Sequence, residues 1–141
     1  LPKWQLEVLG VWVSALNGCA YCVEHHFAGL ERLLADPPRS AAIRAAIDAG
    51  NPAAAPLEPA LIAAMGYARK LTQAPAEMVE ADVAALRAAG HDDGQILEIN
   101  QVVAYFAYAN RTVLGLGCST DGDVLGLSPG NSDDPQDWGH R

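Results

Sequence analysis

The fold is decided by residues 3–35, KWQLEVLGVWVSALNGCAYCVEHHFAGLERLLA. Apolar side chains recur there every three to four residues, which is the period of a helix rather than of a strand. Asn17-Gly18 interrupts the pattern with a dipeptide that is typical of a helix end. We therefore expect one helix from about Lys3 to Leu16 and a second helix from about Cys19 to Ala35.

The rest of the chain, as far as Leu116, continues the helical pattern. Asp36-Pro37-Pro38 is expected to end the second helix, because proline disfavours helix at the residue before it and breaks helix interiors. The further helices that we expect are Ala41–Ala49 with Ser40 as its cap, Glu58-Pro59 to about Gln73, Val79–Ala89, and Asp92 or Asp93 to about Leu116. The last of these carries an apolar stripe of Ile96, Ile99, Val103, Phe106 and Val113.

The pattern predicts an all-α protein with a single domain of five to seven helices, since no stretch alternates as a strand does. A length of 141 residues fits one hydrophobic core. We place the domain at residues 1–117 and an irregular tail, rich in Gly, Ser, Asp and Pro, at 118–141. The chain begins at Leu1 rather than at Met, so we expect the natural start to lie upstream.

Composition argues against two classes of partner. The formal net charge of −8 disfavours nucleic acid, because an acidic chain repels phosphate. The longest apolar run of the N-terminal third, Val8–Val23, is too interrupted for a membrane span. No signal peptide is visible. We therefore expect a soluble cytoplasmic protein without nucleic-acid or membrane partners.

The chain has three cysteines, and two of them form the motif Cys19-Ala20-Tyr21-Cys22. An odd number of cysteines in a chain of this length argues against a secreted disulfide scaffold. The motif follows the expected break, in the first turn of a helix, where unpaired N–H groups and the helix dipole stabilise a thiolate. The two sulfurs share one helical face, so we interpret them as a reactive dithiol.

Two further residues complete a candidate proton relay. His26 lies four residues after Cys22, about 40° round the helix, and can exchange a proton with it. Glu7 interrupts an apolar stretch in which a lone carboxylate would be costly to bury. If the chain reverses at Asn17-Gly18, the first two helices pack together and bring Glu7 to His26. A solvated Glu7 on an imperfect amphipathic helix is the alternative.

Other interpretations of the same residues stay open. Cys19, Cys22 and His26 are three possible zinc ligands, with Cys118 or His25 as a fourth. His25 also lies near the face of Cys22 and is an alternative to His26. A thioredoxin-like fold is disfavoured because the βαβ pattern is absent.

The spacing of these residues resembles a known family. Glu7, Cys19-x-x-Cys22 and x-x-x-His26, within LNGCAYC at residues 16–22 followed by His25-His26, are typical of the AhpD-like alkylhydroperoxidase family of the carboxymuconolactone decarboxylase superfamily. A second stretch is similar to its peroxidase-related branch: Tyr67–Leu71, Pro75, Asp82–Gly90, Val102–Phe106 and Asn110-Arg111. The resemblance covers most of residues 4–117.

The resemblance implies an all-helical homo-oligomer, often a trimer or hexamer, that reduces hydroperoxides through cysteine and needs no cofactor or metal. It implies that Cys22 attacks the peroxide, that Cys19 resolves the product, and that His26 and Glu7 relay protons. An external dithiol, of the lipoyl or thioredoxin-like kind, would restore the thiols. The sequence departs from the family at Tyr21, where histidine is common.

Two other functions compete with a peroxidase. One is a zinc-binding or structural helical module. The other is a non-redox enzyme of the muconolactone decarboxylase type, against which the dithiol argues because that branch does not depend on it. Separately, many small apolar residues on several short helices favour oligomerisation, since one compact domain leaves some of these faces uncovered.

Overall fold

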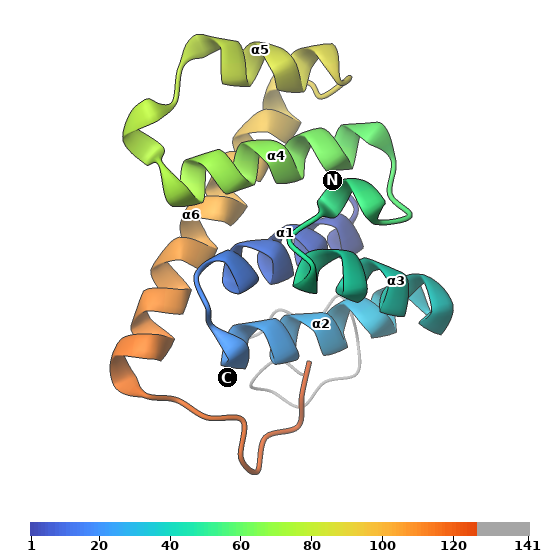
Figure 1. Ribbon diagram of the computed structural model, residues 1–141, viewed down its shortest axis with the longest axis vertical. Coiled ribbons are helices and arrows are strands. Elements are labelled where there is room, and N and C mark those ends of the chain that lie inside the picture. The colour runs from blue at the N-terminus through green and yellow to red at the C-terminus, as the bar shows by residue number, and fades with distance from the viewer. Residues whose placement is uncertain (127–141) are drawn as a thin grey trace.

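Helix α1 (Lys3–Leu16) is the centre of the molecule in the computed structural model, which describes residues 1–126. Every residue from Val8 to Ser14 is buried. A helix that is buried on all sides needs partners on all sides, and α1 contacts α2, α3, α4 and α6. Figure 1 shows α1 in the middle, with α2 and α3 to one side and α4 to the other.

Within residues 1–126, six α-helices follow one another. After α1 they are α2 (Ala20–Leu34), α3 (Pro37–Asp48), α4 (Pro59–Gln73), α5 (Glu80–Ala88) and α6 (Asp93–Leu116), with short 3-10 helices at Pro52–Ala54 and Pro75–Glu77. Residues 1–126 contain no strand, so the predicted all-α class is confirmed. None of the described helices is both long and apolar enough to cross a membrane.

The predicted boundaries hold except at α3. The turn at Asn17-Gly18 is present, with Gly18 at a φ of +68° that favours glycine. Helix α3 begins at Pro37 and not at Ala41, and its cap is Asp36, whose Oδ1 accepts from the N–H of Arg39 at 3.1 Å. The prediction of Ser40 as the cap was wrong, because prolines suit the first turn of a helix, where their missing N–H is not needed.

The core joins α1 to α4 and α6. Trp12 is buried, and its Nε1–H donates to the carbonyl of Met65 on α4 at 2.9 Å. On α6, the predicted stripe is buried from Ile96 to Phe106, but Val113 is only half-buried. The next buried position after Phe106 is instead Asn110, a polar side chain.

The chain folds back after α6. Gly117 ends the helix in the left-handed conformation, and residues 118–126, here called the return segment, reach α2. Arg32 donates to the carbonyl of Leu125 at 2.6 Å. Gly126 lies so close to α2 that a Cβ there would come within 2.7 Å of the backbone nitrogen of Gly29. The division at residue 117 stays a prediction, and 127–141 lie outside the described residues.

Candidate functional site

The two cysteines of the motif meet at the turn between α1 and α2. Cys19 is the residue just before α2, and its N–H donates to the carbonyl of Ser14 at 2.9 Å, which fixes the turn. Cys22 lies in the first turn of α2. Both cysteines are reduced, and their sulfurs lie 2.8 Å apart. Cys19 is 0% exposed and Cys22 is 5% exposed, so both thiols are shielded from bulk water.

Burial decides the acidity of Cys22. It raises the pKa of this thiol from its ordinary value of 9.0 to about 12, and the contact with Cys19 acts in the same direction. The polar side chain of Asn110 acts against them and lowers the pKa. The sequence predicted that the start of α2 would favour a thiolate, whereas burial shifts the pKa of this thiol in the opposite direction.

Glu7 and His26 form the second element of the site. Nδ1 of His26 and Oε2 of Glu7 lie 2.7 Å apart, so α1 and α2 bring together the pair that the sequence indicated. The side chain of Glu7 is only 15% exposed and that of His26 is 35% exposed. Gly29 lies against the carboxylate, with a Cβ position 3.4 Å from Oε1 of Glu7. The solvated interpretation of Glu7 is therefore wrong.

An aromatic ring holds His26 from the other side. Phe106 of α6 meets the imidazole edge to face, with ring centroids 4.5 Å apart and planes at 83°. The ring lies directly on Gly10 of α1, where a Cβ would come within 2.3 Å of it. Gly10 is therefore required for Phe106 to reach His26.

Asn110 is a residue of the site that sequence reasoning missed. It is 0% exposed on α6, and its Nδ2 donates to Oγ of Ser14 at 2.9 Å. Its Oδ1 accepts from Nδ2 of Asn17 at 3.0 Å. The available signal was its place in the apolar stripe, at helical spacing after Val103 and Phe106.

His25 faces a different part of the molecule. Its Nε2 lies 3.0 Å from Oδ2 of Asp123 in the return segment. Tyr21 lies beside it, with ring centroids 4.5 Å apart, and burial followed by the carboxylate of Asp123 raises the pKa of Tyr21. His26, not His25, is thus the histidine that contacts Glu7.

The suggested zinc ligands do not gather into a group of three or more within the described residues. Among residues 1–126, no group of three or more His, Cys, Asp or Glu side chains is arranged to hold a metal ion. Cys118, proposed as a possible fourth ligand, is exposed in the return segment.

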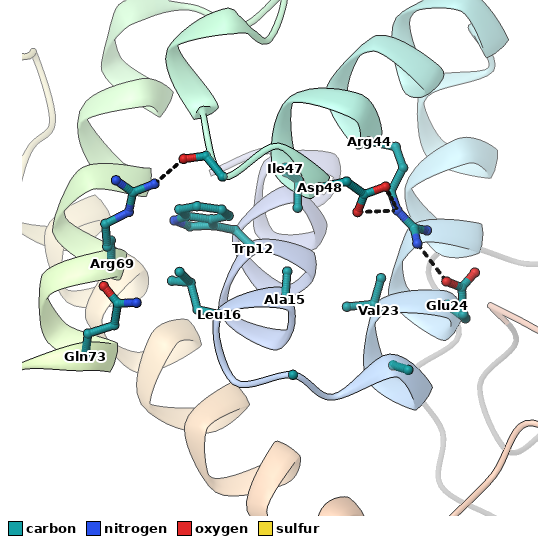
Figure 2. A pocket seen from close by; sticks show the side chains of 13 residues that line it. Trp12, Ala15, Leu16, Val23, Glu24, Arg44, Ile47, Asp48, Arg69 and Gln73 are labelled. Atoms are coloured by element: carbon teal, nitrogen blue, oxygen red, sulfur yellow. Dashed lines mark hydrogen bonds and ion pairs between the residues drawn. The ribbon is translucent and has the colours of Figure 1, made fainter.

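A groove of about 670 Å³ opens beside the dithiol turn, between α1, α2, α3 and α4 (Figure 2). Its floor includes Trp12, over whose ring the guanidinium of Arg69 lies at 4.9 Å. Arg44 on the opposite side is neutralised by Glu24 and Asp48. The residues on either side of Cys19, Gly18 and Ala20, line the groove, but neither sulfur does.

Several solved structures are similar to this chain, and two of them are of peroxidase-related proteins. An uncharacterized peroxidase-related protein from Silicibacter sp. TM1040 is 32% identical, with a TM-score of 0.75 over 84% of this chain and 60% of its own. A protein from Ralstonia eutropha JMP134, described as an alkylhydroperoxidase AhpD core and an uncharacterized peroxidase-related protein, is 31% identical, with a TM-score of 0.73 over 82% and 58%. The chain thus spans about three fifths of their lengths. No family model and no curated protein matches the sequence.

Proposed function

Because the chain belongs to the AhpD-like, peroxidase-related family, we propose that it is a thiol-dependent peroxidase that reduces hydroperoxides. The observation that carries the proposal is the contact of two free thiols, 2.8 Å apart, at the start of α2, one helical turn before the histidine that contacts the partly buried carboxylate of Glu7. Peroxide reduction needs a nucleophile, a resolving thiol and a proton carrier. We assign these roles to Cys22, Cys19, and His26 with Glu7.

The first step oxidises Cys22. His26 accepts the thiol proton while the sulfur attacks the O–O bond of a hydroperoxide ROOH. An S–O bond forms, the O–O bond breaks, and the leaving RO⁻ takes the proton and departs as ROH, which leaves Cys22 as a sulfenic acid. Because burial raises the pKa of Cys22 to about 12, the proton must leave during the attack. Glu7 orients the imidazole and stabilises its charged form.

The second step resolves the sulfenic acid. The sulfur of Cys19 displaces the hydroxyl of Cys22–SOH, a Cys19–Cys22 disulfide forms, and water leaves. An external dithiol, lipoyl or thioredoxin-like, then reduces the disulfide by exchange and is itself oxidised. This antioxidant cycle uses no cofactor bound to the chain, and a pool of reduced dithiols fits the cytoplasm. The groove beside Gly18 and Ala20 is the approach that we assign to the reductant.

We also propose that the protein acts as a homo-oligomer, a trimer or hexamer. Several large apolar side chains on α6 are exposed. They are Leu97, Tyr105, Tyr108, Leu114 and Leu116. Exposed apolar patches of this kind mark contacts between proteins. A monodisperse monomer by light scattering would contradict this part of the proposal.

Thiol titration with one equivalent of an organic hydroperoxide tests the cycle. We expect the loss of two thiols per chain and their recovery with dithiothreitol. Cys22→Ser is expected to abolish peroxide consumption, whereas Cys19→Ser is expected to trap a sulfenic acid or a mixed disulfide. Normal hydroperoxide turnover by Cys22→Ser would refute the proposal. Bound zinc in the purified protein, or lactone decarboxylation that survives loss of both cysteines, would favour the competing functions.

A further inference from the structure

One arginine at the edge of the groove has no carboxylate partner among residues 1–126. The guanidinium of Arg69 donates to the carbonyl of Gly50 at 2.6 Å and lies over the ring of Trp12. Neither of these partners carries a charge. Across the groove, by contrast, Arg44 is paired with two carboxylates. The described part of the chain therefore leaves one positive charge of the groove uncompensated.

The two contacts hold the guanidinium of Arg69 in place. Trp12 is 1% exposed, and its Nε1–H is fixed by the carbonyl of Met65 at 2.9 Å, so its ring is a rigid platform for a cation. A guanidinium has five N–H donors, and the carbonyl of Gly50 accepts from one of them. The remaining donors can pair with an anion at little further cost in ordering.

The surroundings of Arg69 indicate the rest of the ligand. Gln73 follows one helical turn later on α4 and lines the same side of the groove, where its amide can donate to a second oxygen (Figure 2). Apolar side chains cover the groove from this side to α2. They are Ala15, Leu16 and Val23. A volume of about 670 Å³, with an apolar floor and polar groups at one side, suits a small molecule.

We propose that the groove binds a small molecule with one carboxylate and an apolar chain. The carboxylate pairs with Arg69, whose planar fork matches its two oxygens, and the chain lies along the floor toward Gly18 and Ala20. A single charge fits best, because one cation is uncompensated and a chain of net charge −8 repels polyanions. The inference goes beyond the proposed function, which gives the groove to the reductant without assigning any ligand chemistry to it.

The alternative is that Arg69 only ties α4 to the loop at Gly50. Isothermal titration calorimetry with hexanoate and hexanamide, which differ in charge and little in shape, separates the two roles without any turnover. We expect the parent protein to bind hexanoate at least about tenfold more tightly, because hydrogen bonds to a charged group are the stronger ones. In Arg69→Met we expect this preference to disappear, with hexanamide bound as before.

Arg39→Met is the matched control. Arg39 also lies over a tryptophan ring, that of Trp4, at the same distance of 4.9 Å, but it does not line the groove. The variant thus removes the same charge and the same kind of stacking. Because the charge is removed outside the groove, where salt screens it, the affinity for hexanoate should stay within about twofold of the parent.

A second variant keeps the test decisive if Arg69→Met does not fold. Gln73 is exposed, so Gln73→Glu loses no buried contact, and its carboxylate lies one helical turn from Arg69. It would compensate the guanidinium and repel the ligand. We expect the affinity for hexanoate to fall about fivefold, the effect of a unit charge at close range in water, and the affinity for hexanamide to stay unchanged.

Three results would overturn the inference. One is equal affinity of the parent protein for hexanoate and hexanamide. Another is a preference for hexanoate that survives in Gln73→Glu and in a folded Arg69→Met protein. The third is an equal loss in Arg39→Met, which would reduce the effect to the net charge of the chain.

Two kinds of molecule share the proposed chemistry, dithiol acids and the hydroperoxides of fatty acids. One arm compares dihydrolipoate with dihydrolipoamide as the reductant of the Cys19–Cys22 disulfide. The other compares a fatty-acid hydroperoxide with its methyl ester as the oxidant of the thiols. The arm in which the parent prefers the acid, and Arg69→Met does not, identifies the ligand. Only these arms rest on the proposed function, so peroxide consumption by Cys22→Ser would refute that function and leave hexanoate binding standing.

Discussion

Two neighbouring histidines on α2 each contact a carboxylate, and the two pairs differ in what holds the carboxylate. Glu7, the partner of His26, lies on α1, the most buried helix of the protein, and is 15% exposed. Asp123, the partner of His25, lies in the return segment and is 37% exposed. The nitrogen–oxygen distances are similar, 2.7 Å and 3.0 Å.

The comparison shows that the scaffold, more than the contact, decides what a histidine–carboxylate pair can do. A pair on two packed helices keeps its geometry without further ordering. A pair that depends on an exposed segment gains little, because ordering the segment opposes it and water screens the charges. The first pair is suited to proton transfer at a fixed position, and the second to holding the return segment against α2.

The largest expected effect separates the two pairs by activity. Glu7→Gln keeps an acceptor for Nδ1 of His26 but removes the charge that stabilises the imidazolium. We expect kcat/KM for an organic hydroperoxide to fall about 100-fold, within the range of general acid–base effects. Asp123→Asn is the matched control, with an expected change below about threefold. Equal losses of kcat/KM in both variants would contradict the distinction between the two histidine–carboxylate pairs.

The next effect concerns the support of His26. Gly10→Ala places a methyl group within 2.3 Å of the Phe106 ring and forces that ring to move. We expect a loss of about 1–3 kcal/mol in the free energy of unfolding, from overpacking, together with reduced turnover. Gly66→Ala, where no atom lies within 4 Å of the Cβ position, is the control. It is expected to stabilise α4 by up to about 1 kcal/mol, as measured by denaturant unfolding.

A third effect compares the thiols of the two regions. Cys118 in the return segment is exposed, whereas Cys22 is buried, so iodoacetamide near neutral pH should label Cys118 first. Labelling of Cys22 should rise about tenfold per pH unit and level off near its pKa of about 12. Faster labelling of Cys22 than of Cys118 at neutral pH would contradict this order.

The same raised pKa has a consequence for stability. The unfolded chain loses the Cys22 proton near pH 9.0, and the folded chain loses it only near pH 12. The contribution of the protonated, buried Cys22 thiol to the free energy of unfolding is therefore complete below about pH 9. It is lost as the pH rises toward about 12. Unfolding free energies measured over this window should fall more steeply in the parent than in Cys22→Ser. Parallel curves would argue against the raised pKa.

The smallest effect is at the return segment. Asp123→Asn removes the charge that faces His25, and we expect the free energy of unfolding to change by less than about 1 kcal/mol. Hydrogen exchange should accelerate in residues 118–126 and stay unchanged at the α1–α2 turn. Exchange that quickens equally in both places would show that the two regions open together.

The contacts that the sequence predicted are those made within one helical hairpin. Glu7 and His26 are 19 residues apart, in two helices whose periods and connecting turn are readable from the sequence, so their faces could be inferred. Asn110 meets Asn17 and Ser14 across 93 and 96 residues. Nothing local specifies how α6 crosses α1, and an asparagine in an apolar stripe shows only that it needs a partner.

The acidity of Cys22 was mispredicted for a related reason. The helix start is a local feature, and the sequence shows it. Burial of Cys22 to 5% exposure results from packing between segments, and it reverses the expected direction of the pKa shift. The cap of α3 is a smaller case, because Asp36 and Ser40 are both reasonable caps and only the geometry of the two prolines decides between them.

The buried run of α1, from Val8 to Ser14, also sets a spacing. Glu7 stands just before this run and Ser14 ends it, about two helical turns apart and on nearly the same face. Glu7 contacts His26, and Ser14 accepts a hydrogen bond from Asn110. A residue inserted between them would turn one side chain about 100° away from its partner. In the evolution or engineering of this chain, α1 can therefore change its apolar side chains with compensation elsewhere, but a residue gained or lost between Glu7 and Ser14 would separate one of them from its partner.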